Sequence, residues 1–486
     1  MRAAFLLLAL GAAAIPGLAA DAPRASEADL FGAPAAAAAA PASADAAAGL
    51  ASELAKPDAF ARGDTVADPL QIGGIYYQQW NAQFQDGGSL GSTPWSAPLQ
   101  LDVFLDARPN DRLRLFVNSR LLYDPTKDQN GNPTQASSSS LVESELSGGT
   151  TTTAASNPQA LLDQAWLKFD MERTVFITAG KQQVKWGTGH IWNPTDFLNA
   201  QRRDPLQPYD QRLGSPMIKA QLPLDSHQSN LYALALFDNP EAASTLQQEG
   251  GAFRAETVLF NAELGADAVT RAGMSPQYGA DISAPVGPVD AYAEAALLSG
   301  PGNASYQRTT ITAAPGAPLD SLYKSQGLPG PALQASAGLV YDFAWRDNRQ
   351  ATLGGEYFYN ELGVENRGLY PILMFTGRYQ ALYAAKHYAA LYLTAEGPDE
   401  GKHTSYTLTN LANVSDGSYE SRLDLAWVVL ENLTFGAYVA GHYGNQGGEM
   451  DFSLRTPALS DNGRPIPAMD VADVPVEGGL SLRMGF

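Results

Sequence analysis

The sequence predicts an all-β fold, a transmembrane antiparallel up-and-down β-barrel of about 16–18 strands with short turns at one end and long loops at the other. Three observations predict it: segments in which apolar and polar residues alternate, a rhythm of short and long connections between them, and no apolar stretch of membrane-helix length after the N-terminal region. Alternation with a period of two gives a strand one apolar and one polar face. A barrel with lipid outside and water inside is built from such strands.

The N-terminal region is predicted to be an export signal followed by a flexible leader. A short positive head, an apolar stretch and then small residues predict a signal peptide over 1–19. Residues 20–65 are mostly Ala, Pro, Ser and Asp, which predicts a flexible Ala/Pro-rich periplasmic leader, and the barrel is expected to occupy 66–486. The sequence contains no Cys, so neither a disulfide framework nor a lipoprotein anchor is expected.

Four pairs of alternating segments are joined by tight turns, and we predict that each pair is a β-hairpin. The pairs are 99–106 with 112–121, 164–170 with 174–186, 333–343 with 351–359, and 419–429 with 433–443. The first turn is placed at 108–111. Both strands of the first hairpin are close to the length that crosses a bilayer when tilted.

Long polar stretches separate these hairpins, and they are predicted to be external loops. They cover 124–158, 187–215, 299–330, 362–380 and 444–473. Short turns at one end and long loops at the other are typical of a membrane barrel. The alternative, a soluble β-sandwich, is disfavoured because loops of this length are unusual in a compact domain.

The C-terminal segment alternates up to the last residue. Its apolar face carries Leu480, Leu482, Met484 and Phe486, while polar or small residues occupy the other face. This pattern resembles the C-terminal sorting strand of Gram-negative outer-membrane β-barrels, which typically ends in Phe. The resemblance implies the cell outer membrane as the location, with outer-membrane lipid, lipopolysaccharide and the barrel-assembly machinery as partners. A last strand of a β-sandwich is the alternative for this segment alone.

The polar faces of the predicted strands carry charges of both signs, which we expect to face an aqueous lumen. Asp106 and Arg112 are expected to lie opposite each other and pair, and Glu420 is expected to face His442. The residues predicted to line the lumen are Asp102, Asp106, Arg112, Arg114, Arg120, Lys168, Glu420, Arg422, Asp424 and Arg483.

The densest motif follows the second hairpin. It reads Gly-Lys-Gln-Gln-Val-Lys-Trp-Gly-Thr-Gly-His-Ile-Trp-Asn-Pro-Thr-Asp over 180–196, and Arg-Arg-Asp-Pro follows at 202–205. Its beginning is similar to a segment of porin-like outer-membrane families, in which a loop at a comparable place folds into the lumen. That resemblance implies these constriction candidates: Trp186, His190, Trp192, Asp196, Arg202, Arg203 and Asp204. An external loop held by aromatic packing is the alternative.

These observations favour an outer-membrane porin-like channel through which small hydrophilic solutes or ions diffuse. The formal net charge of −20 argues against a nucleic-acid partner. The five His show no metal-ligand spacing, so no metal and no cofactor is expected. No catalytic group is predicted, because Glu420 and His442 form a pair without a third member. A homotrimer is one expected assembly. The alternatives are a substrate-specific transporter or polysaccharide exporter, a barrel enzyme and an adhesin.

Overall fold

A computed structural model describes most of the predicted barrel region. The described residues are 69–85, 93–129, 156–199, 202–207, 212–224, 228–237, 249–300, 303–309, 315–345, 349–375, 378–399, 403–461, 464–466, 469–471 and 473–486. The predicted signal peptide (1–19) and leader (20–65) lie outside the described residues, as does most of the 124–158 stretch.

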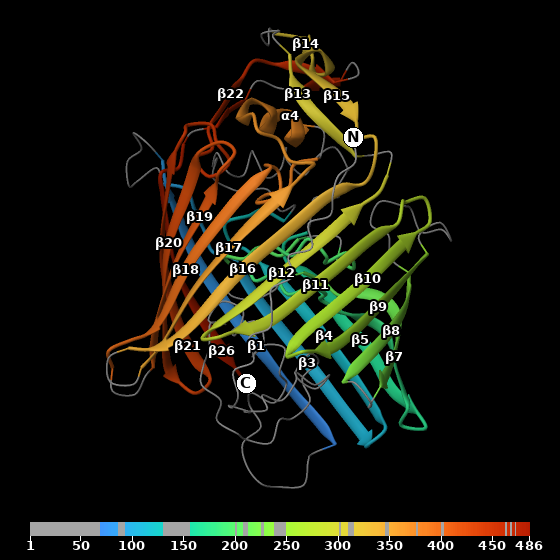
Figure 1. Ribbon diagram of the computed structural model, residues 1–486. Coiled ribbons are helices and arrows are strands. Elements are labelled where there is room, and N and C mark those ends of the chain that lie inside the picture. Colours follow the sequence, from blue (N-terminus) through green and yellow to red (C-terminus); the bar gives the residue numbers. More distant parts are fainter. Residues whose placement is uncertain are drawn as a thin grey trace.

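In the described part of the chain, eighteen antiparallel strands close into a barrel (Figure 1). Each strand pairs with the next one along the chain, and the last closes the ring on the first from Ile75 opposite Gly485 to Phe84 opposite Val476. The prediction of an antiparallel barrel is thus confirmed, at the upper of the two expected strand numbers. In ring order the strands are β1 (Leu70–Phe84), β3 (Leu99–Asn110), β4 (Leu113–Tyr123), β5 (Gln159–Met171), β6 (Val175–Gln182), β7 (Ser215–Leu224), β8 (Ser229–Leu236), β9 (Gly250–Leu259), β10 (Ala262–Arg271), β11 (Gln277–Val286), β12 (Val289–Leu298), β16 (Ala332–Ala344), β17 (Gln350–Asn360), β18 (His387–Glu396), β19 (Thr404–Asn413), β20 (Ser418–Leu430), β21 (Leu433–Gly444) and β26 (Val476–Gly485).

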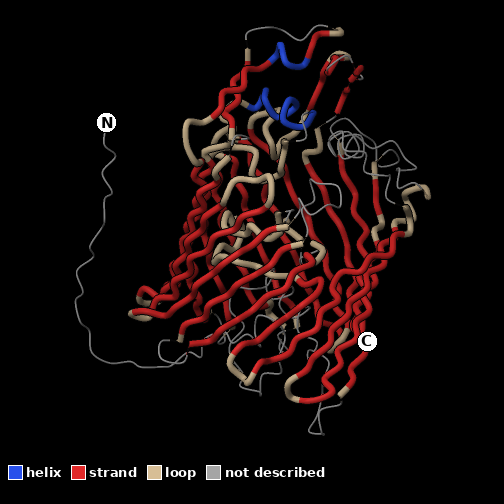
Figure 2. The backbone as a smooth tube through the Cα atoms, turned by 90° about the vertical axis from the view of Figure 1, so that its right-hand side faces the viewer, coloured by secondary structure: helices blue, strands red, loops and turns tan. Residues whose placement is uncertain are grey.

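The two ends of the barrel differ, as predicted. Tight turns join β3 to β4, β9 to β10 and β20 to β21 at one end, whereas the connections after β4, β6, β12, β17 and β21 at the other end are long. Several short elements gather above the long-loop end (Figures 1 and 2). We call them the cap. They are β13 (Ala304–Arg308), β14 (Ala317–Pro318), η4 (Leu319–Leu322), β15 (Tyr323–Gly327), η6 (Arg367–Leu369), α4 (Tyr370–Phe375), β22 (Leu454–Thr456), β23 (Leu459–Asp461), β24 (Arg464–Ile466) and β25 (Met469–Val471).

Two of the four predicted hairpins need correction at their boundaries. The first hairpin has its strand β3 running to Asn110, so the turn lies two residues later than predicted. In the second, β6 ends at Gln182 rather than at residue 186, because the chain leaves the barrel wall there. The third and fourth hairpins match β16 with β17 and β20 with β21. A two-residue strand, β2 (Trp95–Ser96), also pairs with β1.

The outer wall of the barrel is apolar. Leu353 on β17, Leu391 on β18 and Leu423 on β20 are exposed, and Leu391 keeps 53% of its surface accessible. The strand neighbours of these residues point the other way; those of Leu353 and Leu391 are buried on both sides, and Leu423 has the buried Arg422 before it. Such alternation gives the strands an apolar exterior and a polar interior, which suits a wall in contact with lipid. No helix in the described part of the chain has the length and hydrophobicity to cross a membrane.

The C-terminal strand is held along its whole length. Phe486 lies one residue beyond β26, and its backbone exchanges hydrogen bonds with Gly74 of β1, at 2.9 and 3.1 Å. Phe486 is 56% exposed. Leu480 and Met484 are also exposed, whereas Leu482 is half-buried. The predicted apolar stripe of the sorting strand therefore lies on the outer wall, and β26 closes the ring between β21 and β1.

Candidate functional site

The inner wall of the barrel carries buried ion-pair networks. Arg120 on β4 lies directly opposite Asp102 on β3, and its guanidinium contacts Asp102 at 3.0 Å and Asp163 of β5 at 3.1 Å. Across the ring, Arg254 on β9 contacts Asp267 of β10 at 2.9 Å and Asp281 of β11 at 2.8 Å. Each arginine therefore ties three neighbouring strands together from inside.

One predicted pair is wrong. Arg112 does not pair with Asp106; it contacts Asp170 at the start of the short turn, at 2.9 Å, with half of its side chain exposed. Asp106 is instead buried between Arg108 at 2.8 Å and Arg114 at 2.9 Å. The extension of β3 to Asn110 shifts the turn, which places Asp106 opposite Phe116 rather than opposite Arg112.

The remaining predicted lumen charges lie on the inner face. Lys168 of β5 lies beside Arg114 in the strand register, with its ammonium 5.6 Å from the centre of the Phe176 ring. Arg483 shares a face with the buried Tyr77 of β1. Three further charges follow one another on alternate positions of β20: Glu420, Arg422 and Asp424.

On β20, Arg422 is already neutralised. Its guanidinium contacts Asp424 at 2.8 Å and stacks 3.9 Å above the Tyr438 ring. Glu420 lies opposite His442 of β21, as predicted, and it is 7% exposed.

The chain between β6 and β7 runs inside the barrel. We call residues 183–214 the inward segment, of which 183–199, 202–207 and 212–214 are described. Its two ends meet at Asp163 of β5: Gln183 donates from Nε2 at 3.2 Å and the Gly214 amide donates to the backbone carbonyl at 3.2 Å. Apolar residues of the segment then pack on the inner faces of β7 to β10 and of β12; this cluster comprises Val184, Trp186, Phe197, Leu198, Met217, Tyr232, Leu234, Leu236, Ala252, Val269 and Ala296.

A single carboxylate anchors the middle of the inward segment. Glu356, on the inner face of β17, accepts hydrogen bonds from the backbone amides of His190, Ile191 and Trp192 at 3.0, 3.0 and 2.7 Å. The Tyr292 hydroxyl of β12 donates to the same carboxylate at 2.7 Å. Three consecutive amides pointing at one buried anion form a charge-assisted anchor.

A second carboxylate holds the preceding turn. Glu294 of β12 accepts from the Thr188 amide at 2.9 Å and from the Thr195 hydroxyl at 3.2 Å. Gly187 has a φ of +91°, and a Cβ built there would lie 2.1 Å from Glu294 Oε2. Glycine is therefore required at this position, both for its left-handed backbone and for the close approach of the anion.

Trp192 is the best-packed of the constriction candidates. It is fully buried, with its indole 5.8 Å from the Phe358 ring of β17 and 5.7 Å from the Tyr388 ring of β18, measured between ring centres. Its Nε1 donates to the Leu382 carbonyl at 2.9 Å. The aromatic packing places Trp192 against the inner wall rather than outside the barrel.

The other constriction candidates lie at different places along the segment. His190 stacks on Tyr292 with ring centres 4.6 Å apart, and Trp186 lies 5.8 Å from the Arg254 guanidinium. Asp196 pairs with Arg212 at 2.6 Å. Trp186 therefore contacts the inner wall at β9 and His190 contacts it at β12, whereas Asp196 pairs within the segment itself.

The last three candidates follow in the 202–207 stretch. Arg202 donates to the Asn193 carbonyl at 2.8 Å and stacks on Tyr383. Arg203 is half-buried, and Asp204 is exposed.

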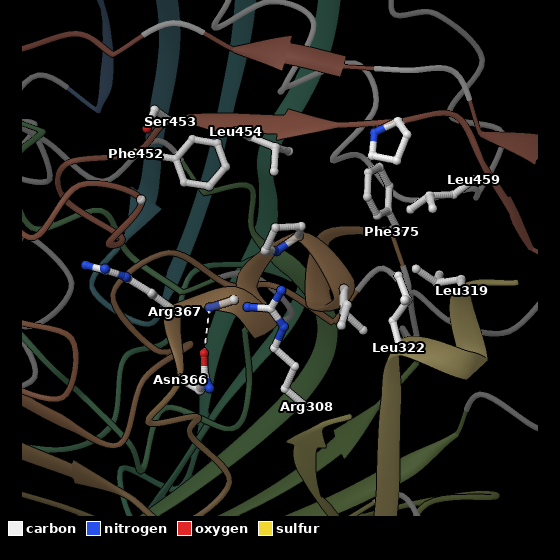
Figure 3. Close-up of a pocket in the computed structure, with 15 residues that line it drawn as sticks. Arg308, Leu319, Leu322, Asn366, Arg367, Phe375, Phe452, Ser453, Leu454 and Leu459 are labelled. Carbon is white, nitrogen blue, oxygen red and sulfur yellow. Dashed lines mark hydrogen bonds between the residues drawn. The ribbon is translucent and has the colours of Figure 1, made fainter. Parts of the chain in front are cut away.

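The cap packs over the mouth of the barrel above β17 to β19. It contains a cavity of about 370 Å³ between η4, α4 and the chain around β22. Figure 3 shows the Arg308 side chain pointing into this cavity among apolar groups such as Leu322, Phe375 and Phe452. The cap cavity is thus mainly apolar with a cationic group.

Glu449, in the β21–β26 connection, is linked to the cap through Asn413 of β19, whose side-chain amide also donates to the Tyr370 hydroxyl of α4 at 2.9 Å. It accepts hydrogen bonds from the Leu382 amide and the Asn413 amide group, each at 2.8 Å, and from the Tyr388 hydroxyl. Burial raises the pKa of Glu449 from 4.5 to about 7. The folded cap therefore binds the proton more tightly than the unfolded chain does.

This raised pKa predicts a cap that loosens with rising pH. The stability that the bound proton contributes is fully present below the unfolded pKa of 4.5 and is lost as pH rises through about 7. The protection of the α4 amides, which is their exchange rate relative to the intrinsic rate at the same pH, is expected to be lower above this pH than below it, and Glu449→Gln should remove that change in protection. Glu365→Gln, at an exposed carboxylate between β17 and η6 that pairs with Lys386, is the matched control. Equal pH dependence in wild type and Glu449→Gln would contradict the assignment.

A family model described as "Protein of unknown function (DUF1302)" matches residues 1–284, more than half of the 486 residues. The chain belongs to this family. No curated protein matches it. In this DUF1302 member, the matched region runs from the N-terminus through most of β11 and includes the whole inward segment.

Several solved porin structures resemble this DUF1302 protein at low identity. OccK8 (OprE) of Pseudomonas aeruginosa is 10% identical, with 86% of this chain and 98% of that chain covered and a TM-score of 0.49. OccAB1 of Acinetobacter baumannii is 9% identical, covering 86% and 96%, with a TM-score of 0.48. The outer membrane protein opdK of Pseudomonas aeruginosa is 10% identical, covering 87% and 100%, with a TM-score of 0.46. The barrel assignment itself rests on the chain's own strand pairing.

Sequence reasoning missed the residues that hold the inward segment. Glu356 is the only acidic residue of β17, and Glu294 is the only one in the middle of β12, whose other acidic residue, Asp290, is exposed near the start of the strand. A lone carboxylate at an inward position of an apolar strand is the signal that marks them, since it must find donors from elsewhere in the chain. Their donors come from a loop more than a hundred residues earlier, which the strand pattern does not reveal.

Proposed function

We propose that the protein is a porin-like channel of the outer membrane through which small hydrophilic solutes or ions diffuse. A closed antiparallel barrel with an apolar outer wall satisfies its backbone hydrogen bonds within lipid. At eighteen strands such a barrel encloses an aqueous space. The inward segment then determines how much of this space is left for solutes.

One observation carries the proposal: the described residues of the inward segment make their contacts along one side of the barrel wall. Its described contacts fall on the walls formed by β5, by β7 to β10 and β12, and by β17 and β18. We infer that the conduit follows the remaining wall, formed by β20, β21, β26, β1, β3 and β4.

The charges on this wall favour a sieve over a single-ion filter. Arg120 is held between Asp102 and Asp163, and Arg422 pairs with Asp424, so both arginines are engaged by neighbouring carboxylates. Selectivity would therefore come mainly from the width that the inward segment leaves and only to a lesser extent from net charge.

The test is electrical. Purified full-chain protein inserted into a planar lipid bilayer is expected to give stepwise conductance. Folding is verified in the same sample by heat-modifiable migration on a denaturing gel. A correctly folded barrel that stays silent over many insertions would overturn the proposal.

A substrate-specific transporter is the second candidate, and the cap cavity favours it. A mainly apolar cavity of about 370 Å³ with Arg308 pointing in has the size and lining of a small-molecule site. This candidate predicts saturable uptake of an amphipathic anion that weakens in Arg308→Ala. Uptake that does not saturate and is equal in the wild type and in Arg308→Ala would exclude this candidate in favour of the porin-like channel.

A further inference from the structure

Three side chains that could ligate a metal ion converge on the inner wall of the proposed conduit. Glu420 on β20, His442 on β21 and Glu477 on β26 each offer one ligand atom, and these atoms all lie within 4.8 Å of one another. They come from three adjacent strands. The sequence pattern suggested only the Glu420 and His442 pair, because Glu477 lies thirty-five residues further along the chain.

The strand register fixes this arrangement. Glu420 is directly opposite His442. Glu477 is opposite Ala440, two positions from His442 on the same face of β21. Directly opposed and diagonal neighbours on one face of a sheet are within reach of long side chains. The backbone thus holds the three groups together before any ligand arrives.

These groups have nothing else to bind in the described part of the chain. Glu420 is 93% buried, since only 7% of its surface is exposed, and no hydrogen bond or ion pair to its carboxylate is found there. The guanidinium of Arg422, two positions along β20, is engaged by Asp424 and Tyr438. A buried carboxylate beside a second carboxylate is costly unless a cation lies between them.

The neighbouring strand adds a further oxygen. Gln83 on β1 lies directly opposite Glu477, and its Oε1 is buried without a hydrogen-bond partner among the described residues. Carboxylate oxygens, an amide oxygen and an imidazole nitrogen therefore share one stretch of the inner wall.

We propose that Glu420, His442 and Glu477 bind one divalent transition-metal ion of the Zn²⁺ type. One imidazole and two carboxylates are a ligand set that first-row transition ions accept, whereas Ca²⁺ and Mg²⁺ prefer oxygen ligands alone. Three protein ligands leave at least one coordination position for water or a solute on the lumen side. The divalent ion would cancel the negative charge of the two carboxylates. This change would occur on the wall that the proposed function assigns to the conduit.

Zinc binding to the purified full-chain protein tests this proposal independently of conductance. The protein is prepared without a polyhistidine tag, treated with a chelator and titrated with Zn²⁺ in a calorimeter. We expect one site per chain, weakened by about tenfold or more in His442→Ala and in Glu420→Gln. Co²⁺ in place of Zn²⁺ should give a visible d–d absorption band that both variants lose.

The matched control is His403→Ala, which removes an exposed histidine in the turn between β18 and β19 at the opposite end of the barrel. It should bind Zn²⁺ as the wild type does. Each variant is first verified as folded by heat-modifiable migration. The absence of a Zn²⁺ site in folded wild type, or a site that survives both His442→Ala and Glu420→Gln, would overturn the proposal. If Zn²⁺ binds as expected but the folded protein gives no conductance in a bilayer, the channel is contradicted and the metal site is supported.

Discussion

Glu356→Ala is expected to free the inward segment from the barrel wall and to raise the single-channel conductance. The substitution removes the acceptor of three consecutive backbone amides, at residues 190, 191 and 192, and of the Tyr292 hydroxyl. Each buried donor left without a partner costs about 1–3 kcal/mol. The anchored conformation should therefore lose about 3 kcal/mol or more, enough for the segment to leave the wall.

The measurement for Glu356→Ala is paired recording of wild type and variant in planar bilayers. Conductance is expected to become larger and noisier, because a released segment no longer holds one position in the lumen. Glu263→Ala removes an exposed carboxylate at the start of β10 and serves as the control with unchanged conductance. A folded Glu356→Ala barrel with the conductance and noise of the wild type would show that this carboxylate is not the anchor.

Arg254→Ala is expected to destabilise the barrel itself. The guanidinium is the shared partner of Asp267 and Asp281, and all three side chains are almost completely buried. Removing one partner of a buried ion pair typically costs about 3–5 kcal/mol, because the remaining charge stays desolvated. Here two carboxylates lose their counter-ion on three adjacent strands.

The readout for Arg254→Ala is the temperature at which the folded band is lost on a denaturing gel. Arg173→Ala provides the comparison, since it breaks an ion pair with Asp111 whose two side chains are 74% and 73% exposed. Exposed pairs contribute about 0–1 kcal/mol, so this control should unfold close to the wild-type temperature. Equal effects of the two substitutions would contradict the assignment of Arg254 to a structural network.

The barrel was largely predictable, because its strands obey a local rule. A period-two pattern with tight turns identified the hairpins of β16 with β17 and β20 with β21, and direct opposition of Glu420 and His442 followed from register. The same rule gave the wrong partner for Asp106, because the turn lies two residues further along the chain than predicted. A shifted turn changes which residues are opposite each other throughout the hairpin.

The interior of the barrel was less predictable, because its contacts join residues far apart in the chain. The many Trp, His, Asn and Arg residues of the inward segment marked it as a candidate site in the sequence. In the structure, Trp192 packs against Phe358 and Tyr388. Nothing local connects Trp192 with Glu356, which lies 164 residues away. The third member of the Glu420 cluster was hidden in the same way, on the strand that closes the ring.

Thiol modification measures most directly where solutes pass. The chain has no Cys, so a single introduced thiol is the only target of a water-soluble thiol reagent. Gln79→Cys places it on the inner face of β1, next to Tyr77 on the proposed conduit wall, and Ala296→Cys places it on β12 under the inward segment. We predict that the reagent lowers the single-channel conductance of Gln79→Cys and leaves that of Ala296→Cys unchanged. If the reagent lowered the conductance of Ala296→Cys and left that of Gln79→Cys unchanged, the proposed path through the barrel would be contradicted.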